Sequence, residues 1–267
     1  MQLPKTLYKY CPADRKDVLE GKRIRFTQAD DLNDLFEMKP VAVATSRAAW
    51  ASALATVARL NPDGPIHDCS QPPSAAEKHK RLTETLKDVL VLCLSSAWDN
   101  IPMWAYYAGE NKGFVVGFNA ESNFLTDLKP VGYASRPTFY GPGNFGSTIY
   151  TKGQHWKHEK EWRAVRNLGK DTPVSTLTPD AVFPIHLFAF EPKDITEVTL
   201  GHRMSMEVRS ALLRILHQPE YNHVTVWQAD PSNERFALQR RQLTRKPDLH
   251  RRLAEVSHEW DQFIREQ

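Results

Sequence analysis

The chain has 267 residues, of which 41% are hydrophobic and 25% charged, and its formal net charge is +3. This composition is typical of a globular protein and excludes a collagen-like or wholly disordered chain. No apolar run approaches the roughly 18 residues that a membrane span needs, and the N-terminal stretch lacks the apolar segment of a secretory signal. The sequence therefore predicts a cytoplasmic protein without a membrane partner, and it leaves the oligomeric state open.

The N-terminal stretch predicts two strands joined by a short helix. Residues 7–10 are rich in β-formers, and residues 22–27 alternate charged and apolar side chains, as a half-buried strand does. Between them, residues 12–20 fit one short helix that ends before Gly21. The two strands are expected to lie next to each other or nearby.

Two helices are predicted in the next part of the chain. Residues 45–61 are rich in alanine, and residues 75–88 are charged on one side. We interpret them as a helical insertion over about 45–88 that packs on one side of the fold. The continuous apolar run at 89–94 then predicts a buried strand.

The remaining elements are mostly strands. A short helix is expected over 102–108, an amphipathic helix over 206–217 and a terminal helix over 248–267. Because strands outnumber helices and do not alternate with them strictly, the sequence predicts an α+β fold with a mixed or antiparallel sheet, in one domain over 1–247. The further predicted strands lie at 113–118, 130–134, 161–166, 183–190, 195–200, 225–228 and 235–243.

Four clusters of polar and aromatic residues are candidates for a functional site. Each combines side chains that bind ligands with side chains that also occur in ordinary cores and turns. The clusters are Tyr8, Lys9 and Tyr10 with Arg25; Asn33 and Asp34 with Glu37; Ser95 and Ser96 with Trp104, Tyr106 and Tyr107; and Trp156, Lys157, Glu159, Glu161, Trp162 and Arg163.

The fourth cluster is the most unusual of these. Glu159 and Glu161 are two residues apart, so on a strand they would share one face, and their repulsion would favour a cation or a catalytic role. Arg163 is expected on the opposite face. The alternative is a surface strand whose acids pair with Lys157 and Lys160.

The other clusters also allow two interpretations. Asn33 and Asp34 fit a turn that satisfies its own backbone, or a polar clamp for a ligand or metal. Trp104 and Tyr107 are three residues apart on a predicted helix and fit a core contact as well as a site. Neither the three cysteines, which form no CxxC pair, nor the histidines show the spacing of a metal site.

The clusters occur in an order that resembles a bacterial family known only as a domain of unknown function, family twenty-nine seventy-one. The segments that carry the resemblance are LYKY, RIRFTQADDLNDLFE, LCLSSAWDNIPMWAYYAGENKGFVVGF and KGQHWKHEKEWR, within residues 7–216. This chain departs from the family pattern at Leu32 and Leu35, where Phe and Pro are usual, and at Asn111, where His is frequent. The family label implies no activity.

The element order also resembles an ADP-ribosyltransferase core, which implies NAD as the cofactor. The resemblance implies that Tyr8 or Tyr10 holds the NAD ribose and that Ser95, with Tyr106 or Tyr107, forms the station where an aromatic ring stacks on the nicotinamide. It assigns the catalytic carboxylate to Glu161.

The resemblance implies further roles around this centre. Glu159 would bind or activate the acceptor, which is a nucleic acid or a protein. Asn33, Arg25 and Arg163 would hold the phosphates or the adenine ribose, and Trp104 joins the cofactor-binding set.

The leading prediction is thus an NAD-dependent ADP-ribosyltransferase-like enzyme, acting as a toxin or a phage-defence effector. The second is a Mg²⁺-dependent nuclease that uses Asp34, Glu37, Glu159 and Glu161 as oxygen ligands. The third is a non-catalytic module that binds a nucleotide or a nucleic acid. The basic C-terminal residues could contact phosphates or form a solvated face; they are Arg235, Arg240, Arg241, Arg245, Lys246, Arg251 and Arg252.

Overall fold

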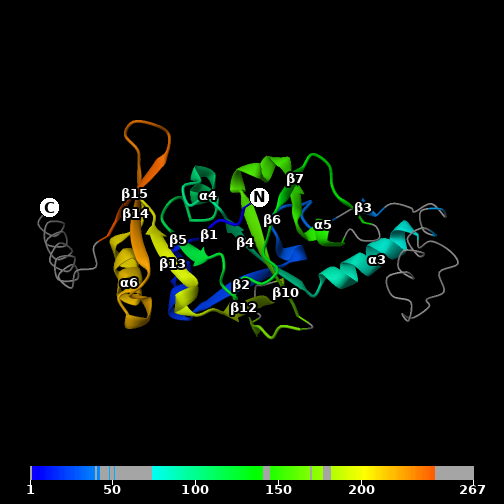
Figure 1. Cartoon of the computed structure of the whole chain (residues 1–267), viewed down its shortest axis with the longest axis horizontal. Coiled ribbons are helices and arrows are strands. Elements are labelled where there is room, and N and C mark those ends of the chain that lie inside the picture. The colour runs from blue at the N-terminus through cyan, green and yellow to red at the C-terminus, as the bar shows by residue number, and fades with distance from the viewer. Residues whose placement is uncertain are drawn as a thin grey trace, which may run out of the picture.

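The computed structural model describes residues 2–39, 41–42, 48, 51, 74–140, 145–168, 170–176 and 182–243. Most of the predicted helix over 45–61 and the whole predicted helix over 248–267 lie outside the described residues. The described chain is an α+β fold with a mixed, largely antiparallel sheet (Figure 1). None of its helices is both long and apolar enough to cross a bilayer.

Eleven strands of the described chain form the main sheet. Nine follow the order β11-β12-β2-β4-β1-β5-β13-β14-β15, and β10 pairs with both β4 and β6. Every neighbouring pair is antiparallel except β13 with β14. The strands are β1 (Thr6–Cys11), β2 (Arg23–Gln28), β4 (Val89–Ser95), β5 (Phe114–Asn119), β6 (Lys129–Pro130), β10 (Glu161–Asn167), β11 (Val174–Thr176), β12 (Ile185–Ala189), β13 (Ile195–Leu200), β14 (Thr225–Pro231) and β15 (Leu238–Gln242).

Two small parallel ribbons flank this sheet. One joins β3 (Val41–Ala42) to β8 (Phe139–Tyr140), and the other joins β7 (Gly132–Ala134) to β9 (Thr151–Gly153). The predicted strand over 130–134 is therefore divided between β6 and β7, and β9 has no counterpart among the predicted strands. This second ribbon supplies one wall of the candidate site.

The helices are short, and two of the longer ones have side-chain caps. A capping box at Ser74 begins α3, and the Ser205 side chain caps α6. Figure 1 places α6 beside β13 and β14 at one end of the molecule and α3 at the other. The helices are α1 (Asp17–Glu20), α3 (Ala75–Leu86), α4 (Ile101–Tyr106), α5 (Phe145–Ile149) and α6 (Met206–Leu216), with 3₁₀ turns η1 (Ala13–Lys16), η2 (Ala29–Asp31), η3 (Gln154–Glu159), η4 (Pro192–Asp194) and η5 (Pro219–Tyr221).

Strand β4 is the point at which the sheet branches. One edge of β4 pairs with β10 along its whole length, from Val89 to Ser95. The other edge is shared, because β2 pairs with β4 at Leu90 and Val91 whereas β1 meets it only at Ser95, opposite Tyr8. Since β1 and β2 diverge from each other between these points, the sheet opens beside the middle of β4.

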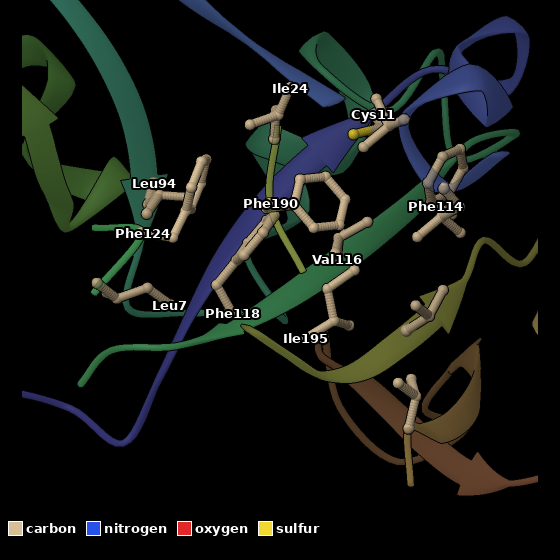
Figure 2. Packing of buried hydrophobic residues seen from close by; sticks show 14 of the residues in the cluster. Leu7, Cys11, Ile24, Leu94, Phe114, Val116, Phe118, Phe124, Phe190 and Ile195 are labelled. Carbon is tan, nitrogen blue, oxygen red and sulfur yellow. The ribbon is translucent and has the colours of Figure 1, made fainter. Parts of the chain in front are cut away.

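The main core lies on one face of β4 and β10. Leu92 and Leu94 face Ala164 and Trp162 across the ladder, and all four belong to the largest buried cluster. Figure 2 shows this cluster where the rings of Phe118, Phe124 and Phe190 meet, with Phe118 and Phe190 in edge contact at a centroid distance of 5.4 Å. This packing fixes the position of the opposite, polar face.

Candidate functional site

A cavity of about 220 Å³ lies where β1 and β2 diverge beside β4. Lys9 helps to close the opening, because its Nζ donates to the carbonyl oxygen of Cys93 at 3.2 Å. The lining comes from β1, the turn after β2, β4, the end of α4, β9 and the start of β10. It includes Tyr8, Tyr10, Asn33, Glu37, Cys93, Tyr107, Lys152, Glu159 and Glu161.

The wall of this cavity holds a cluster of buried charges centred on Lys152. Its Nζ lies 2.7 Å from Glu159 Oε2, 3.1 Å from Glu161 Oε2 and 3.7 Å from Glu37 Oε2. Arg163 Nε donates to Glu161 Oε1 at 2.7 Å, and its NH2 group pairs with Glu37. The side chains of all five are at most 4% exposed. Three acids against two cations leave a formal sum of −1.

Burial and pairing act in opposite directions on the pKa values of these groups. Burial raises the pKa of Glu161, and Lys152 opposes that shift. Burial alone would lower the pKa of Lys152, but the Glu161 and Glu159 carboxylates outweigh it and raise that pKa. Burial lowers the pKa of Arg163 to about 9, so the guanidinium remains a cation at neutral pH. The cluster is therefore held together by ion pairs in a dry environment.

The chain brings Glu159 and Glu161 together differently from the prediction. Glu159 ends η3, and Lys160 follows with a left-handed backbone at φ 47°, so the two acids do not share one strand. Glu161 and Arg163 do, and they point to the same face, so the expectation that Arg163 faces away was wrong. The predicted surface pairing of the acids with Lys157 and Lys160 is also wrong, because both acids are buried against Lys152.

Tyr107 connects the acidic cluster to the rim of the cavity. Its hydroxyl donates to Glu159 Oε1 at 2.7 Å and accepts from Asn33 Nδ2 at 3.0 Å. Burial and the Glu159 carboxylate raise the pKa of Tyr107. The phenol is therefore a neutral donor that orients Glu159.

The two tyrosines of β1 share one strand face but differ in burial. Tyr10 is 4% exposed, and its hydroxyl donates to the Ala97 carbonyl at 2.7 Å. Its ring is in edge contact with Trp104, so Tyr10 belongs mainly to the core. Tyr8 is only half-buried. Burial, followed by the nearby Glu197 carboxylate, raises its pKa to about 12. Tyr8 is thus the more accessible of the two rings.

Besides the alternative ring Tyr106, which is exposed, four residues predicted to bind the cofactor lie outside the described lining of the cavity. The Ser95 hydroxyl donates to the Glu159 carbonyl at 2.6 Å and so fixes the backbone of that acid. Trp104 is fully buried and donates to the Trp98 carbonyl at 2.7 Å. Arg163 is fully buried behind Glu161, and Arg25 pairs with Asp31, which does line the cavity.

The sequence prediction missed two residues of the site. Lys152 comes from the three-residue strand β9, which has no recognisable pattern, although its amine is the centre of the charge cluster. Tyr133 in β7 accepts the Glu161 backbone N–H at 2.8 Å through its hydroxyl. A residue whose importance depends entirely on distant partners leaves no local signal in the sequence.

Three of the four predicted Mg²⁺ ligands surround a lysine amine. Glu37, Glu159 and Glu161 converge, but the Lys152 amine lies between them. Asp34 accepts from the Phe36 backbone N–H at 3.0 Å, as expected for a turn. Within the described ranges, no group of three or more His, Cys, Asp or Glu side chains is placed to hold a metal ion.

The basic C-terminal residues that the structure describes are partly used within the fold. Arg240 lies over the rings of Trp98 and Trp227, with centroid distances of 4.7 and 4.4 Å, and pairs with Glu197. Arg241 pairs with Asp230. The predicted contacts of Arg245, Lys246, Arg251 and Arg252 lie outside the described residues.

Comparisons of the chain with protein-family models, with curated proteins and with solved structures find no match. Function therefore has to be argued from the site itself. The cavity is smaller than the roughly 300–1,000 Å³ of most small-molecule sites, so it suits one ring and a sugar rather than a whole dinucleotide.

Proposed function

We propose that this protein is an NAD-dependent ADP-ribosyltransferase-like enzyme. We also propose that its resemblance to family twenty-nine seventy-one reflects common ancestry. One observation carries the proposal: carboxylates from the EKEWR segment meet tyrosine rings from β1 and from the end of α4 around a single cavity. These elements are far apart in the chain. Such a convergence of rings and acids suits a ligand that combines an aromatic ring with a sugar.

Each residue of the site has a distinct role in this proposal. Cleavage of the nicotinamide–ribose bond builds positive charge on the sugar, and a carboxylate placed beside it stabilises that charge. Glu161 is the group assigned to this task. Tyr8 and Tyr107 offer rings to the nicotinamide, and Glu159 accepts a proton from the acceptor nucleophile as the new bond forms.

The supporting residues hold the two carboxylates in place, and Lys152 opposes the effect of burial on the pKa of Glu161. Lys152 pairs with both, and Arg163 Nε donates to Glu161 Oε1. A buried acid without such partners would take up a proton and lose its charge. The Glu161 carboxylate is the group that stabilises a cationic sugar in this arrangement.

The test is the release of labelled nicotinamide from NAD. The wild type should bind NAD and release nicotinamide, whereas Glu161→Gln should lose about 10²–10³ of the rate, as is usual when an electrostatic stabiliser of the transition state is removed. Glu84→Gln, which changes an exposed acid on α3, is the matched control and should retain the full rate. A wild type that neither binds nor cleaves NAD would refute the proposal.

A second variant separates chemistry from folding. Tyr107→Phe keeps the ring but removes the hydroxyl that orients Glu159. It should remain folded by circular dichroism and bind NAD, with a reduced rate of release.

One observation favours a non-catalytic nucleotide-binding module as the second candidate. All four oxygens of Glu159 and Glu161 already have partners, which are Tyr107, Lys152 and Arg163. A binding module would take up NAD or a related nucleotide without turnover. Under that alternative, Glu161→Gln would bind as the wild type does and neither protein would release nicotinamide.

A further inference from the structure

A second cavity of about 380 Å³ lies against the charge cluster. Lys152 lines both cavities. The turn after β2 also contributes to both, since Glu37 lines the first cavity whereas its neighbours Phe36 and Met38 line the second. The two cavities are therefore neighbours that share Lys152 and the turn after β2.

The chemistry of the second cavity differs from that of the first. Its described lining contains no carboxylate and includes Arg136 and His155. Lys152 lines it as well, but the Lys152 amine is paired with the acids of the first cavity. Phe36 presents a large apolar ring that is 70% exposed. Hydroxyl groups complete the lining, from Ser135, Thr138, Thr148 and Thr151.

We propose that the second cavity is a subsite for a nucleotide, with the phosphate near Arg136 and the base against Phe36. Guanidinium and hydroxyl groups are the usual partners of phosphate oxygens, and an exposed aromatic ring stacks on a base whatever its sequence. The volume lies within the range of cavities that hold small ligands.

The charge distribution supports this assignment over the first cavity. Glu37, Glu159 and Glu161 bring three carboxylates to the wall of the first cavity, and carboxylates repel a phosphate. The described lining of the second cavity has Arg136 and hydroxyl-bearing residues instead. A ligand with a cationic ring at one end and phosphates at the other would place the ring in the first cavity and the phosphates in the second, passing over the rim between them.

The nucleotide could come from two sources. It could be the ADP half of the dinucleotide whose ribose occupies the first cavity, an assignment that rests on the proposed function. It could also be a separate nucleotide unit, such as one of an acceptor strand. The chemistry of recognition is the same in both cases, and competition distinguishes them.

The experiment is a calorimetric titration of the protein with AMP. Arg136→Ala and Phe36→Ala should each weaken AMP binding about tenfold or more, the loss expected when a phosphate contact or a stacked ring is removed. Leu35→Ala, an exposed neighbour of Phe36, and Arg214→Ala, an exposed arginine of α6, are the matched controls and should bind as the wild type does. The inference is overturned if the wild type does not bind AMP, or if both cavity variants bind it unchanged.

Competition assigns the source of the nucleotide. If NAD displaces AMP and Arg136→Ala weakens NAD as well, the subsite belongs to the same dinucleotide. If AMP and NAD bind together, the subsite takes a separate nucleotide; both outcomes support a nucleotide subsite. AMP binding that depends on Arg136 in a protein that never cleaves NAD would support the subsite and refute the proposed function alone, whereas NAD cleavage without AMP binding would refute only the subsite.

Discussion

The two faces of the β4–β10 ladder follow different rules. On one face Leu92, Leu94, Trp162 and Ala164 are almost completely buried among apolar neighbours. On the other face Glu161 and Arg163 are equally buried, yet they are charged and depend on specific partners from η3, β9 and the turn after β2. The same two strands therefore support both a core and a site.

The two faces differ in how precisely the neighbouring side chains have to be placed. Apolar packing tolerates any neighbour of suitable shape, because burial of area is not directional. Buried charges require a partner at a defined distance, and replacing such a cluster by apolar side chains is often neutral or stabilising. The buried charges of the polar face therefore contribute little to the stability of the fold, which is a physical reason to expect that they have a function.

The largest expected effect is on the apolar face. Trp162→Ala should lower the free energy of unfolding by about 4 kcal/mol, because it removes a large buried ring and leaves a space that its neighbours cannot fill. Urea denaturation measures this loss. The loss should be the same at neutral and mildly acidic pH, since no titratable group is involved. A loss that changes strongly with pH would show that the two faces are not independent.

The second effect is on the polar face and should depend on pH. Lys152→Met leaves Glu159 and Glu161 without their shared cation, which should cost about 3 kcal/mol at neutral pH because Arg163 and Tyr107 still contact them. As the pH falls and Glu161, whose pKa burial raises, takes up a proton, the difference from the wild type should become smaller. Urea denaturation of the wild type and Lys152→Met from neutral to acidic pH measures this difference. A difference in the free energy of unfolding that does not change with pH would show that the ion pairs are unimportant.

The main strands around the site could be predicted, because their patterns are local. The apolar run at 89–94 and the alternation at 161–166 each mark a strand whose burial the sequence already specifies. The short strand β9 could not be found in this way, since three residues carry no period. The helix over 75–88 was predicted from its charged face and is observed as α3, which ends at Leu86.

The site was predictable only in part. Its rings and acids stand out by type, and Tyr8, Tyr107 and Glu161 do line one cavity. The direction of Arg163 follows from simple alternation, which places it on the face of Glu161. Lys152 was not predictable, because nothing near it in the chain indicates that three acids from other segments will surround it.

The smallest effect concerns Tyr133, which lies next to the polar cluster without carrying charge. Tyr133→Phe removes the acceptor of the Glu161 backbone N–H and should cost about 1 kcal/mol. Burial raises the pKa of Tyr133 from 10.0 to about 12, so the folded protein keeps the phenol proton to a higher pH than the unfolded chain does. The stability that this proton retention contributes is fully present below pH 10.0 and is lost as the pH rises through about 12.

The difference in unfolding free energy between the wild type and Tyr133→Phe should therefore be constant up to about pH 10 and shrink above it. Urea denaturation at several alkaline pH values measures this difference, and the ultraviolet absorbance of tyrosinate follows the ionisation directly. A difference that stays constant through about pH 12 would mean that Tyr133 titrates alike in the folded and unfolded chains. In that case water would reach Tyr133 in β7 more easily than Lys152. The difference between the two faces of the ladder would then concern the buried ion pairs alone.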